Sequence, residues 1–395
     1  MALPPAQHAS AEARSERVSA LVVLAAAAAL VFSVIVYCQF LVIPVIEGDP
    51  ALMSAAAPAN ALDHRTYVDY IQTFDQRLGA PATGIDNNIG IAALYHQLLM
   101  LVSADVSAAP WLSLVLNTSA ILIALYAWCA IRRWLCLPDW TSLIFFAAGP
   151  WLYFSQLINK DALSAAIILL GVLATMRRNI IALLALVVVA ALVRLQLPLF
   201  LIGLWFLAGA RRWWPTALAI YVSCALAAAA IERTMPIFMG DSAASGGMGI
   251  SALVQSLNAR YGIGALLLNP IRVVQYFFDL CRAVLSGLTQ SHSLAELKGA
   301  PILLLLLWLL PNYVRLLFGL HRVASAYFRP LLSAIWVFFC VWLINPTINE
   351  RYLLLITPVI VLLGLAARLI GRPATTPCGH YQLVVGGAVD RRRGA

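Results

Sequence analysis

Residues 179–210 read NIIALLALVVVAALVRLQLPLFLIGLWFLAGA, an apolar run that holds one charged residue, Arg194. As a single helix this run would be ~48 Å long at ~1.5 Å per residue, whereas the core of a bilayer is only ~30 Å thick. It would also carry the arginine pairs at 177–178 and 211–212 to opposite sides of the membrane, although positive residues favour the cytoplasmic side. We therefore expect two short helices that turn near Arg194, helped by Pro198.

The composition of the whole chain extends this membrane interpretation. The 395 residues are 62% hydrophobic and 11% charged, with a mean hydropathy of +0.88. A soluble domain rarely covers that much apolar surface. The sequence predicts an all-α polytopic membrane protein with about ten transmembrane helices, because a membrane span must satisfy its own backbone hydrogen bonds. The apolar runs are 18–46, 111–131, 141–158, 161–176, 179–193, 195–210, 215–231, 300–320, 330–346 and 352–370.

The basic residues set the predicted orientation. Arginine pairs recur after every second run, as at 132–133 and 177–178, and such residues favour the cytoplasmic side. We therefore expect a bacterial inner (plasma) membrane protein, with residues 1–17 and the tail 371–395 in the cytoplasm and one transmembrane domain over 18–370. The net charge of +9 is a feature of proteins that bind nucleic acid. We reject nucleic acid as a partner because the basic residues flank apolar runs in short pairs.

Two long loops are predicted on the outer face, at 47–110 and 232–299. Each contains an apolar stretch that is short for a span, 89–102 in the first loop and 273–288 in the second. We expect these stretches to form short interfacial helices. The length argument also folds residues 141–176 into a hairpin whose polar tip, Asn-Lys-Asp, faces outward.

This topology collects uncommon polar residues on the outer face. Most have a structural alternative: Asp63 can cap the helix that follows it, Asp161 can cap its own helix, and Lys160 can extend to lipid headgroups. Arg351 can anchor the interface. Arg194 is harder to explain, because an arginine at span depth costs ~2.5–3.5 kcal/mol and usually faces a cavity or a partner. The candidate site residues are Asp63, His64, Tyr67, Lys160, Asp161, Arg194, Glu350, Arg351 and Tyr352.

Three cations that face an isolated acid suggest a donor that carries phosphate. Lys160, Arg194 and Arg351 can hold phosphate oxygens and stabilise the charge that develops on a leaving phosphate. Asp63 can take the proton from an attacking hydroxyl, which gives direct displacement with inversion at the sugar carbon. Supporting or substrate-binding roles are assigned to His64, Tyr67, Asp161, Glu350 and Tyr352.

Four short motifs resemble one enzyme family. They are Asp-x-x-x-Tyr at 63–67, the apolar helix IAALYHQLLML at 91–101, Lys-Asp at 160–161 and ERYLLLITP at 350–358. Together they look like the GT-C superfamily of polyprenyl-phosphate-sugar glycosyltransferases and the related O-antigen and exopolysaccharide polymerases. The resemblance implies catalysis on the outer face, a polyprenyl-linked donor and a first-loop acid as base, which we carry onto Asp63.

The chain departs from this family pattern at His64, where many members have a second acid. A divalent cation stays open as a cofactor, but the second acid that would support it beside Asp63 is missing. The sequence also has no Cys-x-x-Cys pair to indicate a zinc site. We therefore predict no metal ligand.

The leading interpretation is an inner-membrane glycosyltransferase that transfers a hexosyl or pentosyl group at the periplasmic face. Its expected partners are a polyprenyl-phosphate-linked donor, an envelope glycan or lipid acceptor and membrane lipids, with no nucleic acid. One alternative is a polymerase that joins lipid-linked repeat units, in which Arg194 and Arg351 matter more than Asp63. The other is a transporter or flippase of a lipid-linked glycan, although such proteins often have internal repeats and midplane sites and the sequence indicates neither.

Overall fold

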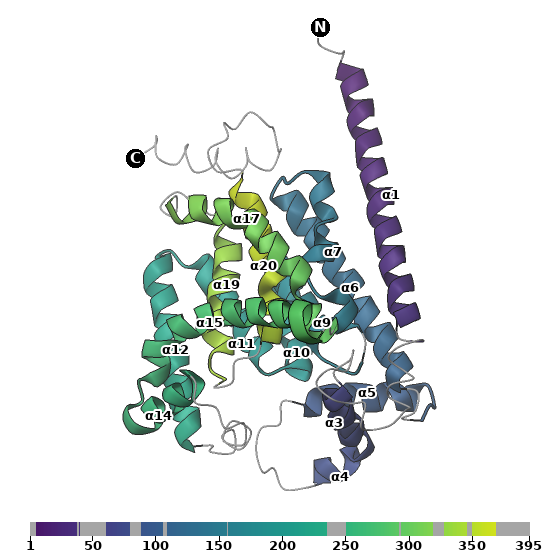
Figure 1. Cartoon of the computed structure of the whole chain (residues 1–395). Helices are drawn as coiled ribbons and strands as arrows, with labels where there is room; N and C mark the ends of the chain where they lie inside the picture. The colour runs from purple at the N-terminus through teal and green to yellow at the C-terminus, as the bar shows by residue number, and fades with distance from the viewer. Residues whose placement is uncertain are drawn as a thin grey trace.

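The computed structural model describes residues 5–37, 39, 61–79, 88–105, 109–155, 157–234, 250–291, 294–318, 328–345 and 350–368. Within these residues all regular structure is helical, which confirms the all-α prediction (Figure 1). The predicted cytoplasmic tail, 371–395, and parts of both long outer loops lie outside the described residues.

The helices form a bundle with a separate group of short helices at one end. The long helix α1 (Pro5–Tyr37) lies along one side (Figure 1). The short helices α3 (Ala61–Gln72), α4 (Phe74–Gly79) and α5 (Ile89–Leu101) gather at the end opposite the start of α1. The remaining α-helices are α6 (Ala109–Trp134), α7 (Phe145–Ala148), α8 (Trp151–Phe154), α9 (Asp161–Met176), α10 (Ile180–Val193), α11 (Gln196–Gly209), α12 (Trp213–Thr234), α14 (Ile250–Tyr261), α15 (Gly264–Ser286), α16 (Leu294–Leu297), α17 (Ala300–Phe318), α19 (Arg329–Trp342) and α20 (Glu350–Ala367).

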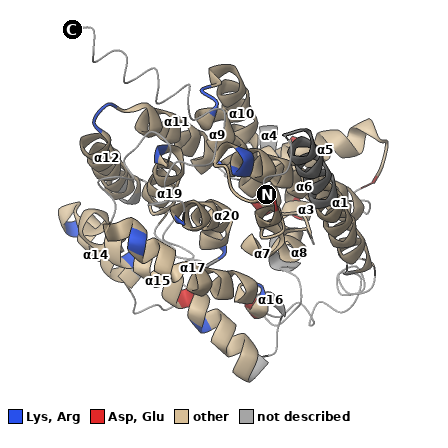
Figure 2. Ribbon diagram, turned by 90° about the horizontal axis from the view of Figure 1, so that it is seen from above, with Lys and Arg blue, Asp and Glu red and all other residues tan. Residues whose placement is uncertain are grey.

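Helices α9 and α20 lie at the centre of the bundle. Seen from above, α20 lies among α9, α15, α17 and α19 (Figure 2), and it packs against all four. Every residue of α20 from Leu353 to Ala367 is buried, and α9 is buried over most of its surface. A helix that is apolar on all sides is expected in such a position. The first residues of these two helices, Asp161 and Glu350, therefore mark where the centre of the bundle begins.

Three of the described helices are long and apolar enough to cross a membrane. They are α6, α17 and the part of α12 from Trp213 to Ile231. Large apolar side chains on them are exposed, among them Val115, Leu218 and Leu304, and an extensive apolar surface suits lipid better than water. The structure thus supports a membrane protein. Shorter apolar helices are Ala20–Val36, Ile89–Leu101, Asp161–Met176, Ile180–Val193, Gln196–Gly209, Arg329–Trp342 and Arg351–Ala367.

The run 179–210 forms two helices, as predicted. α10 and α11 pack against each other, and Arg194 separates them with an extended backbone (φ −162°, ψ 129°). The side chain of Asn179 accepts a hydrogen bond from the Ala182 amide at 3.0 Å and so caps α10. The break at Arg194 confirms that the run is not one long helix.

The run 141–158 does not form the single helix that the sequence analysis expected there. It holds the end of a 3-10 helix (Asp139–Ser142) and the single-turn helices α7 and α8. Gly149, between α7 and α8, is extended (φ −149°, ψ 156°). Pro150 follows it and lacks the amide hydrogen that would continue a helix. The high hydropathy of the run concealed this Gly-Pro break.

Both short helices predicted in the outer loops are present. α5 matches the predicted stretch 89–102 closely, whereas α15 begins well before the predicted stretch 273–288. α14 precedes α15, and the sequence analysis did not predict it. The position of these helices at a membrane interface stays a prediction.

Prolines inside α15 and α20 leave backbone carbonyls without their helical donors. Pro270 cannot donate to Leu266, and the Leu266 carbonyl instead accepts from the Tyr221 hydroxyl of α12 at 2.5 Å. The Leu354 carbonyl, left free by Pro358, lies 2.9 Å from the hydroxyl of the threonine that precedes this proline. An unsatisfied backbone group costs several kcal/mol in lipid, and side-chain hydroxyls commonly replace the lost bond there.

Candidate functional site

The turn between α8 and α9 presents Lys160 and Asp161. The side-chain amide of Asn159 donates to two carbonyls of this turn, both at 2.9 Å, and its oxygen accepts from the Asp161 amide at 2.9 Å. Asn117 of α6 donates to the Leu157 carbonyl at 2.8 Å. These bonds hold the turn against α6 and fix the point at which α9 begins.

Asp161 joins two arginines that are distant in sequence. Its side chain is fully buried, in the first turn of α9. Nη2 of Arg194 donates to its Oδ1 at 3.0 Å, and Nε of Arg351 donates to its Oδ2. Arg194 follows α10, and Arg351 lies in the first turn of α20. Because a buried charge is costly unless it is paired, the carboxylate holds both guanidinium groups in place.

Arg194 keeps donor capacity beyond this ion pair. It is 4% exposed, and its Cζ lies 5.4 Å from the centroid of the Tyr352 ring. Its Nε is buried and has no hydrogen-bond partner within the part of the chain that the structure describes. A guanidinium group carries five N–H donors in a fixed arrangement, so this arginine can hold Asp161 and still donate to an anionic ligand.

Lys160 points into the protein, which argues against the structural alternative that it extends to lipid headgroups. It is 7% exposed, and its Nζ lies 2.8 Å from Oδ1 of Asn88 and 5.9 Å from the centroid of the Tyr67 ring. The Tyr67 hydroxyl lies 3.4 Å from the same Asn88 oxygen. Lys160 therefore connects the start of α9 to α3 and to the turn that precedes α5.

Gly90 allows α5 to approach the end of α10 closely. A Cβ added at Gly90 would lie 2.2 Å from the backbone oxygen of Leu192. Gly90 follows Asn88 by two residues, and Leu192 precedes Arg194 by two. The close contact therefore brings the segment that holds the partner of Lys160 to the segment that holds the arginine.

His64 of α3 is buried and uncharged at neutral pH. It is 3% exposed, and no described residue forms a hydrogen bond with its Nδ1. Burial lowers the pKa of the imidazole from 6.5 to about 4, because an environment without water disfavours the charged form. His64 can therefore accept a hydrogen bond from a ligand, but it adds no positive charge to the site.

The side chains of Asp63 and Glu350 lie outside the described part of the chain. The backbone places Asp63 in α3, about one helical turn before Tyr67, and Glu350 at the first position of α20. Because α3 begins at Ala61, Asp63 lies inside the first turn and not at the N-cap. The observed start of α3 therefore does not support the alternative in which Asp63 is the N-cap. Asp161 likewise lies inside the first turn of α9, which has Lys160 at its N-cap.

The sequence analysis missed the roles of Asn88 and Asn159. Asparagine side chains bond to backbone groups in turns and at helix starts, and both residues directly precede such starts. Two adjacent asparagines before the apolar helix α5 were the available signal. The contact of Asn88 with Lys160 could not be predicted, because it joins segments that only the tertiary packing brings together.

The described cluster contains three cations, Lys160, Arg194 and Arg351, and the carboxylate of Asp161. It lies where α9 and α20 begin, and a helix N-terminus favours negative charge. Arginine forks and helix starts together suit a phosphate group. Within the described residues no three His, Cys, Asp or Glu side chains are grouped so that they could hold a metal ion.

Comparisons with protein-family models, with curated proteins and with solved structures found no match for this chain.

Proposed function

We propose that this chain is a membrane-embedded glycosyltransferase that takes its sugar from a polyprenyl-phosphate-linked donor. The observation that carries the proposal is the meeting of Arg194 and Arg351 on the buried carboxylate of Asp161, with Lys160 next to it in the chain. Two held guanidinium groups suit a phosphate. Among the described residues the buried Nε of Arg194 has no partner, and a phosphate oxygen would accept its hydrogen bond.

In this proposal the cations stabilise the negative charge that develops on the leaving polyprenyl phosphate. Asp161 is a positioning residue, because it holds both arginines before the donor arrives. Asp63 accepts the proton of the acceptor hydroxyl as that oxygen attacks the sugar carbon. The bond from the sugar carbon to the phosphate oxygen breaks as the glycosidic bond forms, with inversion. Exclusion of water from the bundle would limit hydrolysis.

The proposal includes the predicted topology. About ten crossings place both termini in the cytoplasm and the Asp161 cluster at the periplasmic face of a bacterial inner membrane. The arginine pairs between apolar runs support this orientation, and the resemblance to the GT-C superfamily supports the donor class. The acceptor would be an envelope glycan or lipid.

The test is sugar transfer by the purified full-length chain in nanodiscs, supplied with radiolabelled sugars on a short polyprenyl phosphate. We expect transfer to fall tenfold or more in Arg194→Lys, because lysine keeps the charge but loses the planar fork. Arg260→Lys, at an exposed position of α14, is the matched control and should transfer at the wild-type rate. Equal rates in all three proteins would refute a phosphate role for Arg194.

A polymerase of lipid-linked repeat units is the second candidate function. The observation that favours it is that both arginines share one carboxylate, which is a site built around arginine. Asp63→Asn separates the two functions: loss of a general base lowers turnover by ~10²–10⁴-fold, whereas an arginine-centred polymerase would retain its rate. A flippase would move the labelled donor across the bilayer without transferring its sugar.

A further inference from the structure

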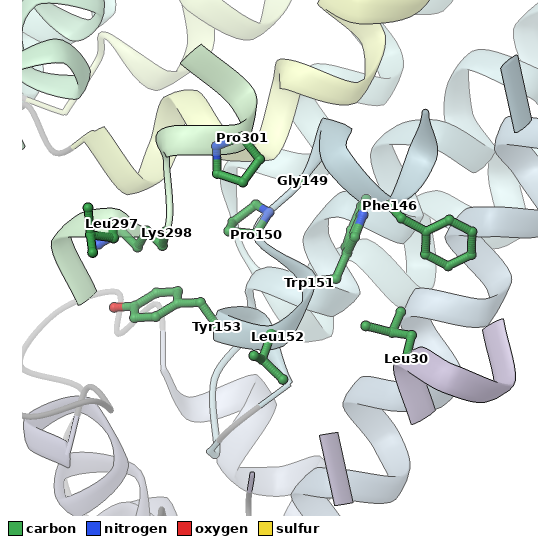
Figure 3. Close-up of a pocket in the computed structure, with 10 residues that line it drawn as sticks. All are labelled: Leu30, Phe146, Gly149, Pro150, Trp151, Leu152, Tyr153, Leu297, Lys298 and Pro301. Carbon is green, nitrogen blue, oxygen red and sulfur yellow. The ribbon is translucent and has the colours of Figure 1, made fainter. Parts of the chain in front are cut away.

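A pocket of about 240 Å³ lies between α1, the α7–α8 segment and the start of α17 (Figure 3). It shares no residue with the Asp161 cluster. Its lining is mostly apolar, and Lys298 is the one charged residue among the described side chains that line it. We propose that this pocket binds one anionic phospholipid, with hydrocarbon against the apolar wall and the phosphate at Lys298. This proposal does not depend on the glycosyltransferase function.

The pocket exists because the run 141–158 does not form a continuous helix. At Gly149 and Pro150 the chain turns away, and Trp151 then folds back onto α7. The Trp151 ring stacks on Phe145 with centroids 4.4 Å apart, and its Nε1 donates to the Phe145 carbonyl at 2.6 Å. With its polar group satisfied, the tryptophan offers a fixed apolar surface to the pocket.

The helices beside the pocket have outer faces that suit lipid. α1 contributes Leu30 to the pocket and exposes Phe32, and α17 contributes Pro301 and exposes Leu304. Phe32 is 68% exposed and Leu304 is 69% exposed. In a membrane these faces contact hydrocarbon, and the pocket lies between them. We therefore expect a lipid chain to enter the pocket from the side.

Lys298 gives the pocket its preference for an anion. Its Nζ lies 4.4 Å from the centroid of the Tyr153 ring, and a cation over an aromatic face is held by the charge distribution of the ring. Figure 3 shows Lys298 and Tyr153 at one end of the pocket and Leu30 and Phe146 at the other. A single ammonium group with an apolar surface beyond it matches a phosphodiester with one negative charge and an acyl chain.

The test is native mass spectrometry of the delipidated full-length chain, titrated with phosphatidylglycerol or with zwitterionic phosphatidylcholine. We expect one phosphatidylglycerol to bind in preference to phosphatidylcholine. Lys298→Met should weaken phosphatidylglycerol binding roughly fivefold, the effect of ~1 kcal/mol for one lysine at an anionic lipid, and leave phosphatidylcholine binding unchanged. Arg260→Met removes an exposed cation from α14 and should bind both lipids as the wild type does.

A second variant tests the apolar wall. Leu30→Trp fills the pocket from α1 without a change of charge, and we expect it to lower the binding of both lipids. Helical content and a monodisperse elution profile verify that each variant is folded. Equal affinity of the wild type for the two lipids would overturn the proposal, whether or not Lys298→Met folds. Wild-type binding by a folded Lys298→Met or Leu30→Trp protein would also overturn it.

Discussion

Asp161 is the single residue on which the candidate site depends. It is fully buried, and each of its carboxylate oxygens accepts from a different arginine. A purely structural ion pair would have the same contacts, so burial alone does not separate the two roles. Among the described residues the buried Nε of Arg194 has no hydrogen-bond partner, but neither has that of Arg132, which pairs with Asp139. Ligand binding by variants of Arg194 and Arg351 therefore separates the two roles.

Replacement of Asp161 by asparagine should destabilise the protein strongly. The amide keeps the shape of the side chain but leaves two arginines without their counter-charge, and breaking a buried ion pair costs ~3–5 kcal/mol. Thermal unfolding in detergent measures the effect. Asp75→Asn is the control, because the Asp75 side chain is 84% exposed, and its expected effect is within ~0.5 kcal/mol. Equal melting temperatures for the wild type and Asp161→Asn would show that Asp161 holds neither arginine.

His64 should make stability depend on pH in mildly acidic solution. Its pKa is about 4 in the folded protein and 6.5 when unfolded, so the unfolded state binds more protons between these values. The free energy of unfolding should therefore fall as the pH drops from 6.5 toward 4, by up to ~3 kcal/mol. Unfolding of the wild type and of His64→Gln across this range tests the prediction. An unchanged pH profile in His64→Gln would contradict it.

At the scale of elements, the close contact between α5 and α10 determines how the site is assembled. Gly90→Ala would place a Cβ 2.2 Å from the backbone oxygen of Leu192, so α5 must move. We expect a loss of ~1–3 kcal/mol in stability and weaker donor binding, because Asn88 moves with α5. Gly209→Ala, with no atom within 4 Å of the added Cβ, is the control for unfolding and for binding. Unchanged donor binding by Gly90→Ala would show that α5 does not help to position the site.

The hydrogen bond beside the proline of α15 can also be tested by mutation. Tyr221→Phe removes the donor to the Leu266 carbonyl that Pro270 leaves free. A buried carbonyl without a donor costs ~1–3 kcal/mol, and this bond is part-buried, so we expect thermal stability to fall by about 1 kcal/mol, the lower end of that range. Tyr126→Phe, at a 60% exposed position of α6, should have little effect. If both variants unfold alike, the hydroxyl of Tyr221 contributes nothing to α15.

The bounds of the helices could be predicted where membrane thickness and the positions of charged residues constrained them. They were harder to predict where tertiary packing determined them. The break at Arg194 follows from the thickness of a bilayer, and the structure has it. The break at Gly149 was visible as a Gly-Pro pair, but hydropathy over 141–158 outweighed it in the prediction. The sequence analysis predicted Lys160, Arg194 and Arg351 on one face of the membrane. It could not show that two of them share Asp161, because that contact depends on how α9, α10 and α20 pack.

At the scale of the whole molecule, the proposed topology makes a direct prediction. Reporter fusions after Arg178 and Arg212 should report the cytoplasm, and fusions near Lys160 and Arg194 should report the periplasm, because the arginine pairs favour the cytoplasmic side. Expression of each fusion as a full-length membrane protein is the control. If Lys160 and Arg178 report the same side, α9 does not cross the membrane and the proposed topology fails.

The central claim is that the cluster of Lys160, Arg194 and Arg351 holds the phosphate of a lipid carrier. The most direct measurement is the dissociation constant of a short polyprenyl phosphate for the wild type, Arg194→Lys, Arg351→Lys and the control Arg260→Lys, with the matching polyprenol alongside. We predict that Arg194→Lys and Arg351→Lys bind the phosphate at least tenfold more weakly, with unchanged affinity for the polyprenol and wild-type behaviour in the control. Equal affinity of all four proteins for the phosphate would contradict the claim.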